Sequence, residues 1–413
     1  MTTESVNPYL IAGSGRDAKP HVLFVDDNEQ ADPAQLSAML LEYGVDARLR
    51  HPESTIKTDL DWANLIVIDY FLTYWPERDE TESVARKPYD GLAAAASMRS
   101  ALLPSLAERL PGEVPARSVA FALWSSNLKE ATFDLPEVVL PHVFSRDNNL
   151  EWAFRRSDLL DDLGIKQIAL LAQAATRLPG QWPSRPSDAE RQMMVMLGLI
   201  PEFGSKEQVQ DGNFWRDDAR DDVLNCRPPI HELSERSHGL ALLRWLLHRI
   251  FPYPCFLLDE QQLCARLRVD ALEGGTASGP SLLETLSPYQ YIGTLAGFGG
   301  NRWWRSGVED WLFNQTGGQP GSPIAVAEVA IRHGAAANRT WLRPVIVLNG
   351  DLARSTEFAE VDRTVRVRPD DWPVFADDAF ALQDLAREDP TLRALVQPAD
   401  RILLAPSIAD DAS

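Results

Sequence analysis

The first part of the chain alternates short apolar runs with longer amphipathic stretches. The run "HVLFV", which begins at His21, is rich in residues that favour strands, and "ADPAQLSAMLLEYG" predicts a helix that stops at Gly44. "VDARLR" predicts a second strand, and "ANLIVIDY" predicts a third strand that is apolar on both faces. "DGLAAAASMRSALLPSLAERL" predicts a helix, "SVAFALWSS" a fourth strand and "HVFS" a fifth, followed by a long helical region. Strands that alternate with helices predict an α/β fold with a doubly wound, five-stranded parallel sheet.

Turn-rich segments divide the chain into four predicted parts. "RLPGQWPSRPSDAE" is rich in proline and leads into a predicted helix in which Ser187 and Glu190 fit a capping box, and "TGGQPGSP" makes a second break. The chain between the breaks reads as mainly helical, and "IAVAEVAI", "RPVIVLN" and "TVRVR" beyond them look strand-like. The predicted parts are a flexible tail (1–19), a parallel-sheet domain (20–178), a mainly helical domain (179–318) and a mixed α/β C-terminal region (319–413).

Composition and charge narrow the class of protein. The 413 residues are 45% hydrophobic and carry a formal net charge of −20, which would repel duplex DNA overall. Three scattered cysteines make no disulfide framework, and the start "MTTESVNPYL" lacks the regions of a signal peptide. The most apolar stretch, "GLALLRWLLHRIFPYPCFLL", is interrupted by charged residues and prolines. These features predict a cytoplasmic protein without a membrane span.

Carboxylates stand where the predicted strands end. Asp26 and Asp27 end the first strand, and Asp69 ends the third. Because parallel strands bring their carboxyl ends to one edge of the sheet, we expect these three side chains to converge. Like charges in one place need a cation, and a site made only of oxygen ligands favours Mg²⁺. One carboxylate could then attack a phosphoryl donor.

The predicted fourth and fifth strands add a hydroxyl and a cation to this edge. The fourth strand ends in Ser125 and Ser126, whose hydroxyls can hydrogen-bond a phosphoryl oxygen. The fifth ends near Arg146, which can pair with the same phosphate. Acids, hydroxyl and cation together predict a site for phosphoryl transfer to aspartate.

Residues 20 to about 175 resemble the receiver domain of two-component response regulators. The matching segments are "VLFVDDN", "LIVIDYFL", "YDGLAAAASMR" and "FALWSS". The resemblance implies that Asp69 is the phosphoacceptor, that Asp26 and Asp27 hold Mg²⁺ with Asp69, that the backbone carbonyl of Phe71 is a further metal ligand, and that Ser125 is the switch hydroxyl. It also implies that a histidine kinase or a phosphotransfer protein supplies the phosphoryl group.

The sequence departs from the family pattern in two ways that bear on function. An acidic insertion at residues 73–88, "TYWPERDETESVARKP", lies beside the active edge, where the family has only a few residues. Arg146 stands where the family has a lysine, and its planar head cannot reproduce the geometry of an ammonium group. We therefore expect phosphorylation with a weak read-out.

Several readings of the whole chain stay open. The leading one is an atypical response regulator whose output is a protein–protein interaction, rather than an enzyme in its own right. The alternatives are a pseudo-receiver scaffold that is not phosphorylated, for instance in a bacterial stress or phage-defence assembly, a DNA-binding transcription regulator, and an enzyme within residues 320–413. The stretch "ASGPSLLETLS", which would supply a recognition helix, contains no Lys or Arg, so DNA binding is not favoured. Residues 180–413 resemble no family.

Overall fold

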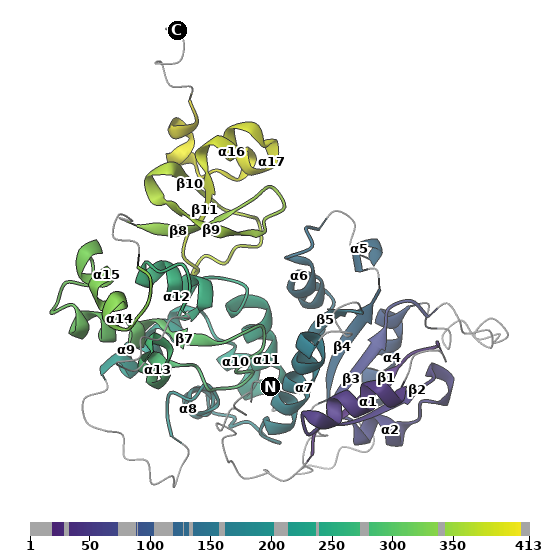
Figure 1. Cartoon of the computed structure of the whole chain (residues 1–413). Coiled ribbons are helices and arrows are strands. Elements are labelled where there is room, and N and C mark those ends of the chain that lie inside the picture. The colour runs from purple at the N-terminus through teal and green to yellow at the C-terminus, as the bar shows by residue number, and fades with distance from the viewer. Residues whose placement is uncertain are drawn as a thin grey trace.

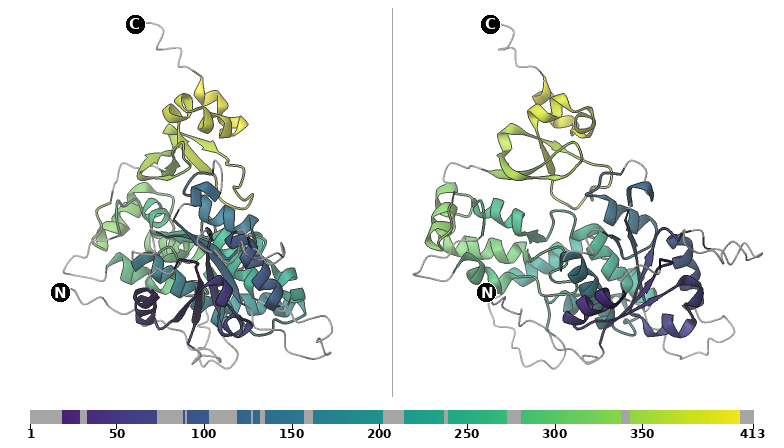
Figure 2. Two further views of the ribbon diagram at one scale, coloured as in Figure 1. Left: turned by 90° about the vertical axis from the view of Figure 1, so that its right-hand side faces the viewer. Right: turned by 45° about the vertical axis from the view of Figure 1, so that its right-hand side comes forward.

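The computed structural model shows three parts along the chain (Figure 1). A parallel sheet with its helices comes first, a mainly helical part follows, and a small mixed sheet lies at one end of the molecule, as the further views also show (Figure 2). The structure describes residues 19–28, 33–72, 88, 90–102, 119–126, 128–131, 135–156, 162–201, 214–236, 239–272, 281–337 and 343–405.

The first part is built on a five-stranded sheet in which all neighbouring strands are parallel, in the order β2-β1-β3-β4-β5. Its strands are β1 (His21–Val25), β2 (Asp46–Arg50), β3 (Leu65–Asp69), β4 (Ala120–Ser125) and β5 (Trp152–Arg155). All residues of β3 and β4 are buried, which explains why their sequences are apolar on both faces. The prediction of a five-stranded parallel sheet is confirmed.

Helices cover both faces of this sheet. They are α1 (Pro33–Glu42), α2 (Lys57–Trp62), α4 (Gly91–Leu102), α5 (Leu128–Ala131), α6 (Leu140–Asp147) and α7 (Asp162–Arg177). Val22, Phe24 and Val67 share a core with α1 and α7, whereas Leu23 and Ile66 share a second core with α2, α4 and α6. Because strand residues alternate between the faces, one strand supplies both cores.

The predicted fifth strand at "HVFS" is wrong. These residues lie inside helix α6, where Leu140, Val143 and Phe144 follow a helical spacing and are buried on one face. The fifth strand is β5, which stands in the stretch that the sequence analysis assigned to a helical region. A run of four residues is too short for its hydrophobic period to distinguish a strand from a helix. Trp152–Arg155 is identified as the fifth strand by its pairing with β4.

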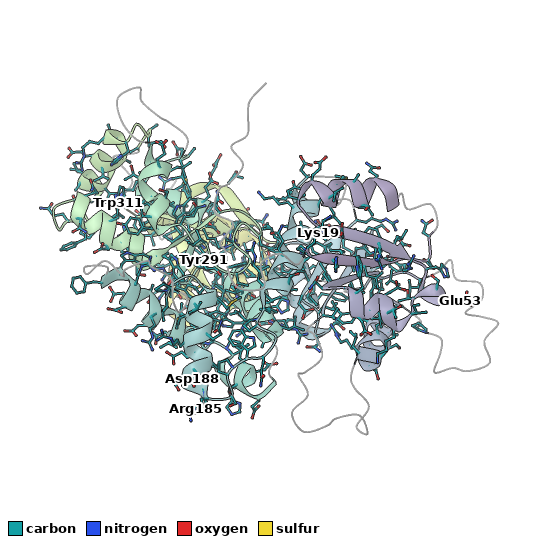
Figure 3. All side chains as sticks on the ribbon, turned by 90° about the horizontal axis from the view of Figure 1, so that it is seen from below. Lys19, Glu53, Arg185, Asp188, Tyr291 and Trp311 are labelled. Carbon is teal, nitrogen blue, oxygen red and sulfur yellow. The ribbon has the colours of Figure 1, made fainter. Side chains whose placement is uncertain are left out.

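The second part is mainly helical, as predicted, with a two-stranded antiparallel sheet of β6 (Leu257–Asp259) and β7 (Arg302–Trp304). In Figure 3, seen from below, Tyr291 lies in the interior of this part, and Asp188 and Arg185 lie at its outer edge. Its helices are α8 (Pro186–Met196), α9 (Phe214–Asn225), α10 (Ile230–Arg236), α11 (Leu240–Trp245), which continues into the π-helix η4 (Leu246–Ile250), α12 (Glu260–Leu267), α13 (Leu282–Leu286) and α14 (Arg305–Gln315).

The predicted capping box at Ser187 is also wrong. Helix α8 begins at Pro186, so Ser187 lies inside its first turn, and the N-cap residue is Arg185. Proline favours the first helical position because its missing N–H would have no helical partner there. The physical signal for this helix start is therefore the proline and not the serine.

The first two parts share one hydrophobic core. A single cluster of buried side chains joins Phe24 of the sheet, Ile168 of α7, Met193 of α8 and Trp245 of α11. Helix α7 has the parallel sheet on one side and helices of the second part on the other. The predicted boundary at residue 178 thus separates two regions of sequence that pack as one body.

The third part contains a four-stranded mixed sheet in the order β10-β11-β8-β9. Its elements are β8 (Pro344–Leu348), β9 (Arg354–Glu360), β10 (Thr364–Val367), β11 (Ala379–Leu382), α16 (Gln383–Glu388) and α17 (Pro390–Leu395). The strands predicted at "RPVIVLN" and "TVRVR" are confirmed as β8 and β10. The strand predicted at "IAVAEVAI" is wrong.

That segment forms helix α15 (Pro323–Arg332), capped by the hydroxyl of Ser322. The side chains of Val326, Ala327, Val329 and Ala330 are buried, which is the spacing of one helical face. Val326, Val329 and Ala330 share a hydrophobic cluster with residues of α12 and α14. Proline at the first helical position and the serine cap outweigh the strand preference of the β-branched residues.

Two further predictions concern the insertion and tail, and the absence of a membrane span. The predicted insertion at 73–88 lies outside the described residues except for Pro88, as does nearly all of the predicted tail. In the part of the chain that the structure describes, no helix is both long enough and apolar enough to cross a bilayer.

Candidate functional site

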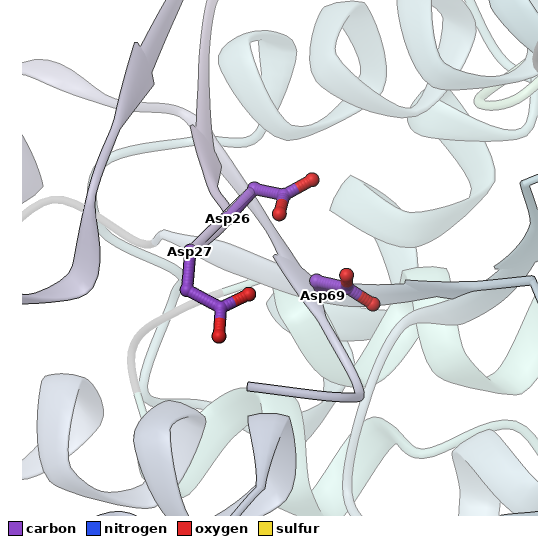
Figure 4. Close-up of side chains that lie close together, drawn as sticks. All are labelled: Asp26, Asp27 and Asp69. Carbon is purple, nitrogen blue, oxygen red and sulfur yellow. The ribbon is translucent and has the colours of Figure 1, made fainter. Parts of the chain in front are cut away.

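Three buried carboxylates converge at the carboxyl edge of the parallel sheet (Figure 4). Asp26 and Asp27 follow β1 directly, and Asp69 is the last residue of β3, the neighbouring strand. Their side chains are 3%, 3% and 6% exposed, and one carboxylate oxygen from each lies within 4.8 Å of the others. The predicted convergence of these acids is confirmed.

Local hydrogen bonds hold two of the acids in place. The backbone N–H of Asn28 donates to a carboxylate oxygen of Asp26 at 2.8 Å, and the backbone N–H of Phe71 donates to one of Asp69 at 3.3 Å. Each bond closes a short turn in which an aspartate accepts from the residue two positions further on. The strand ends therefore aim these carboxylates before any ligand arrives.

Arg156, the residue directly after β5, reaches two of the carboxylates. Its guanidinium nitrogens lie 3.2 Å from an oxygen of Asp26 and 3.4 Å from an oxygen of Asp69. The guanidinium also lies over the ring of Trp124, 4.7 Å from the ring centroid, and the backbone N–H of Arg156 donates to the carbonyl of Ser125 at 2.8 Å. The sheet thus brings a cation from its fifth strand to acids from its first and third.

Burial changes the acidity of this cluster. Burial, together with the negative charge of Asp26, raises the pKa of Asp69 from 3.8 to about 7. The N–H of Phe71 and the charge of Arg156 act in the opposite direction. Burial also raises the pKa of Asp26, against the N–H of Asn28 and the charge of Arg156. The site therefore concentrates negative charge that a further cation would stabilise.

The donor set and its spacing fit Mg²⁺. In an octahedral Mg²⁺ site with metal–oxygen bonds of about 2.1 Å, ligand oxygens lie about 3 to 4.2 Å apart. Oxygens of Asp26, Asp27 and Asp69 lie within 4.8 Å of one another, which is close to that range. Among the described residues, these three form the single cluster of at least three Asp, Glu, His or Cys side chains close enough to share a metal ion.

The two other residues that the resemblance implied lie beside this cluster. Ser125 is the last residue of β4, is fully buried, and stands next in sequence to Trp124, which pairs with Asp69 across the strands. Phe71 lies two residues beyond Asp69 and binds it through its N–H. Their roles as phosphate contact and metal ligand remain predictions.

Arg146 does not occupy the predicted place at a strand end. It lies in α6, where its guanidinium pairs with Asp371 of the C-terminal part at 2.7 Å and with Asp147 at 3.1 Å. Its partners make it a link between the parallel-sheet part and the C-terminal part. Arg156 takes the position after the fifth strand that the sequence analysis gave to Arg146.

Gly91 packs against the backbone at the end of β3. Its N–H donates to the carbonyl of Tyr70 at 2.9 Å, and a Cβ at this position would lie 2.3 Å from the backbone oxygen of Asp69 and 2.9 Å from Leu123. Only glycine lets helix α4 begin this close to the end of β3. The "YDGL" segment is thus explained by a close approach of two backbones.

Sequence reasoning missed Arg156. Its signal was the short apolar run "WAF" followed by two arginines, but four residues of strand inside a region with helical character gave no distinct period. The neighbouring Arg155 bonds to the carbonyl of Glu137 instead of to the acids. Which of the two arginines faces the site follows from strand pairing alone.

His231 and Cys226, in the helical part, do not belong to the acidic cluster. His231 is exposed and pairs with Glu235, and Cys226 is buried, where its carbonyl accepts from Trp245. His238 lies outside the described residues. In comparisons with known proteins, no protein-family model, no curated protein and no solved structure matches this chain.

Proposed function

We propose that the parallel-sheet part acts as a receiver that accepts a phosphoryl group on Asp69 in the presence of Mg²⁺, within an atypical response regulator. The observation that carries this proposal is the convergence of Asp26, Asp27 and Asp69 within 4.8 Å, beside the guanidinium of Arg156. An acidic pair after one strand, an acid at the end of its neighbour and a cation after the fifth strand supply the metal ligands, the nucleophile and the phosphate partner that phosphoryl transfer to aspartate would use.

The reaction follows from the positions of these groups. A carboxylate oxygen of Asp69 attacks the phosphorus, while the bond from phosphorus to the leaving group breaks and its electron pair departs with an imidazole or an acetate. Mg²⁺ held by Asp26 and Asp27 would neutralise the charge on the transferred oxygens. Asp69 must be ionised to attack, and a cation bound beside it would lower its pKa from about 7.

Arg156 and Ser125 are the groups placed to contact the product. The guanidinium now paired with Asp26 and Asp69 can turn its two parallel N–H groups to the new phosphoryl oxygens. Ser125 stands at the end of the adjacent strand with its hydroxyl as a second donor. The donor of the phosphoryl group would be a histidine kinase or a phosphotransfer protein, and the output a protein–protein contact.

The test is to incubate the full chain with Mg²⁺ and acetyl phosphate and to measure intact mass. We expect the mass of one phosphoryl group to be added, and the addition to be lost in Asp69→Asn and when EDTA replaces Mg²⁺. Asp61→Asn, an exposed aspartate on α2, is the matched control and should be phosphorylated like the parent. An unchanged parent mass, or equal labelling of Asp69→Asn, would contradict the proposal.

A second candidate is a pseudo-receiver that keeps the fold as a scaffold and is not phosphorylated. The observation in its favour is that Arg156 already supplies a positive charge to Asp26 and Asp69 without a metal ion. The same mass measurement separates the two candidates, since the parent chain of a scaffold would gain no phosphoryl group.

A further inference from the structure

A cavity of about 680 Å³ lies where the helical part meets the C-terminal mixed sheet. Helix α12, strands β8 and β11 and the segment from 372 to 380 form its walls. Its volume falls in the range of about 300 to 1,000 Å³ that small-molecule sites occupy. It is distant in sequence from the acidic cluster and shares none of its residues.

The lining of this cavity is unusually basic for this protein. Five arginines from separate segments line it, against three acids, Glu309, Asp377 and Asp378. The lining therefore has a positive formal charge, whereas the whole chain has a net charge of −20. The five arginines are Arg266, Arg268, Arg305, Arg343 and Arg354.

Three of these arginines are held in fixed orientations. Arg305 donates two parallel hydrogen bonds to Asp377, at 3.1 and 2.6 Å. Arg266 makes a similar two-bond pair with Glu309, and Arg354 pairs with Asp259. These pairs hold three planar guanidinium groups in place along the walls of the cavity.

Arg268 has a backbone conformation that is unfavourable for a residue with a side chain. It ends α12 with φ 60° and ψ 39°, the left-handed conformation in which helix ends favour glycine. Its side chain is nevertheless buried and lines the cavity close to Arg266, and burial lowers its pKa. A residue kept in this conformation where glycine would relieve it indicates a role for the guanidinium.

Arg343 and an apolar wall complete the cavity. Arg343 is exposed and directly precedes β8, and its backbone N–H donates to a carboxylate oxygen of Glu360 at 2.9 Å. Val345, Ile346 and Phe380 are half-buried on the sheet and line the cavity together with Trp372. The cavity thus offers cationic groups and an apolar, partly aromatic surface.

We propose that this cavity binds a phosphorylated small molecule with a planar ring, of the size of a nucleotide. Guanidinium groups match phosphate geometry with two parallel hydrogen bonds, and we assign the phosphate to Arg268 and Arg343, which both line the cavity. The ring then lies against the apolar wall near Phe380 and Trp372. The inference does not depend on the proposed function of the acidic cluster.

The experiment titrates the full chain with three probes, AMP, ribose 5-phosphate and inorganic phosphate, by calorimetry and by thermal unfolding. We expect AMP to bind and to raise the unfolding midpoint, and the two probes without a ring to bind about tenfold more weakly. Arg268→Gln and Arg343→Gln should each weaken AMP binding about tenfold. Arg363→Gln, an exposed arginine outside the cavity, should bind AMP like the parent.

Three results would overturn the proposal. The first is that none of the probes binds at millimolar concentration. The second is that Arg343→Gln binds AMP as tightly as the parent. Because Arg343 is exposed, this variant should fold even if Arg268→Gln does not. The third is that ribose 5-phosphate binds as tightly as AMP, which would remove the ring from the recognised chemistry.

Discussion

The fold disfavours the ionised form of Asp69. It is 6% exposed, and its ionised form has Asp26 and Asp27 beside it. Because its pKa is about 7 in the folded chain and 3.8 ordinarily, folding takes up a proton between these two pH values. The contribution of Asp69 to stability therefore falls as pH rises from about 4 to about 7, and it stays low above that range.

Asp69→Asn tests this consequence in metal-free buffer. At pH 8 we expect the variant to unfold with a free energy roughly 2 to 4 kcal/mol higher than the parent, since it buries no charge there. The difference should shrink towards zero near pH 4. Urea unfolding across this pH range measures it, with the exposed Asp61→Asn as control. A difference that does not depend on pH would contradict the shifted pKa.

Gly91→Ala tests the close approach behind Asp69. The added Cβ would lie 2.3 Å from the backbone oxygen of Asp69, so either α4 or the end of β3 must move. We expect a loss of about 2 to 3 kcal/mol in unfolding free energy, together with weaker Mg²⁺ binding.

Gly180→Ala is the matched control for this change. A Cβ at Gly180 has no atom within 4 Å, and its backbone is not left-handed, so we expect stability to change little or to rise slightly. Chemical denaturation of the two variants side by side gives the comparison. Equal stability of Gly91→Ala and Gly180→Ala would show that the close approach of Gly91 to the backbone of Asp69 does not require glycine.

At the level of elements, the end of β5 determines how the acidic cluster is balanced. Arg155 and Arg156 are adjacent, yet one bonds to Glu137 and the other to Asp26 and Asp69. A β-strand sends neighbouring side chains to opposite faces, so the strand register selects which arginine reaches the acids. The cation therefore competes with a metal ion for the same oxygens.

Arg156→Gln should strengthen Mg²⁺ binding. Removing a unit positive charge that lies 3.2 Å from Asp26 leaves the carboxylates more attractive to Mg²⁺, and we expect a gain of roughly 1 kcal/mol, or about five- to tenfold in affinity. Calorimetric titration with MgCl₂ measures it. Arg155→Gln removes the same charge from the adjacent position and should leave the affinity unchanged. Weaker binding in Arg156→Gln would mean that the arginine supports the metal site.

At the scale of the whole molecule, buried polar contacts join the sheet to the helical part. Glu151 is fully buried between them, where it accepts from Arg244 of α11 at 2.7 Å and from the N–H of Phe121 in β4. Nε2 of His248 lies 2.9 Å from its carbonyl oxygen. Together with the shared hydrophobic core, these contacts make the two parts depend on each other for stability.

Glu151→Gln should destabilise the whole chain. It leaves the guanidinium of Arg244 without its charged partner at a site that is largely closed to water, and we expect a loss of about 3 kcal/mol. Glu137→Gln, which removes an exposed acid paired with Lys129, should change the free energy of unfolding far less, because water screens an exposed ion pair. Urea unfolding followed by Trp fluorescence should show one shifted transition for Glu151→Gln. Two separate transitions would mean that the parts unfold independently.

The sequence by itself determined the parallel sheet and its acidic edge. Buried strands that are apolar on both faces are recognisable without a partner, and parallel strands must end at a common edge. Asp26, Asp27 and Asp69 could therefore be placed together from strand ends alone, and Ser125 at the end of the next strand. This signal is complete in β3 and β4, whose residues are all buried, whereas the residues of β2 are only partly buried.

Only the tertiary structure decided which cation completes the site and how the parts join. The runs before Arg146 and Arg156 are equally short and apolar, and packing makes the first a helix and the second a strand. The single core across residue 178 and the arginine-lined cavity are built from segments far apart in sequence. Such contacts depend on side chains that meet only when the chain is folded, so no local pattern encodes them.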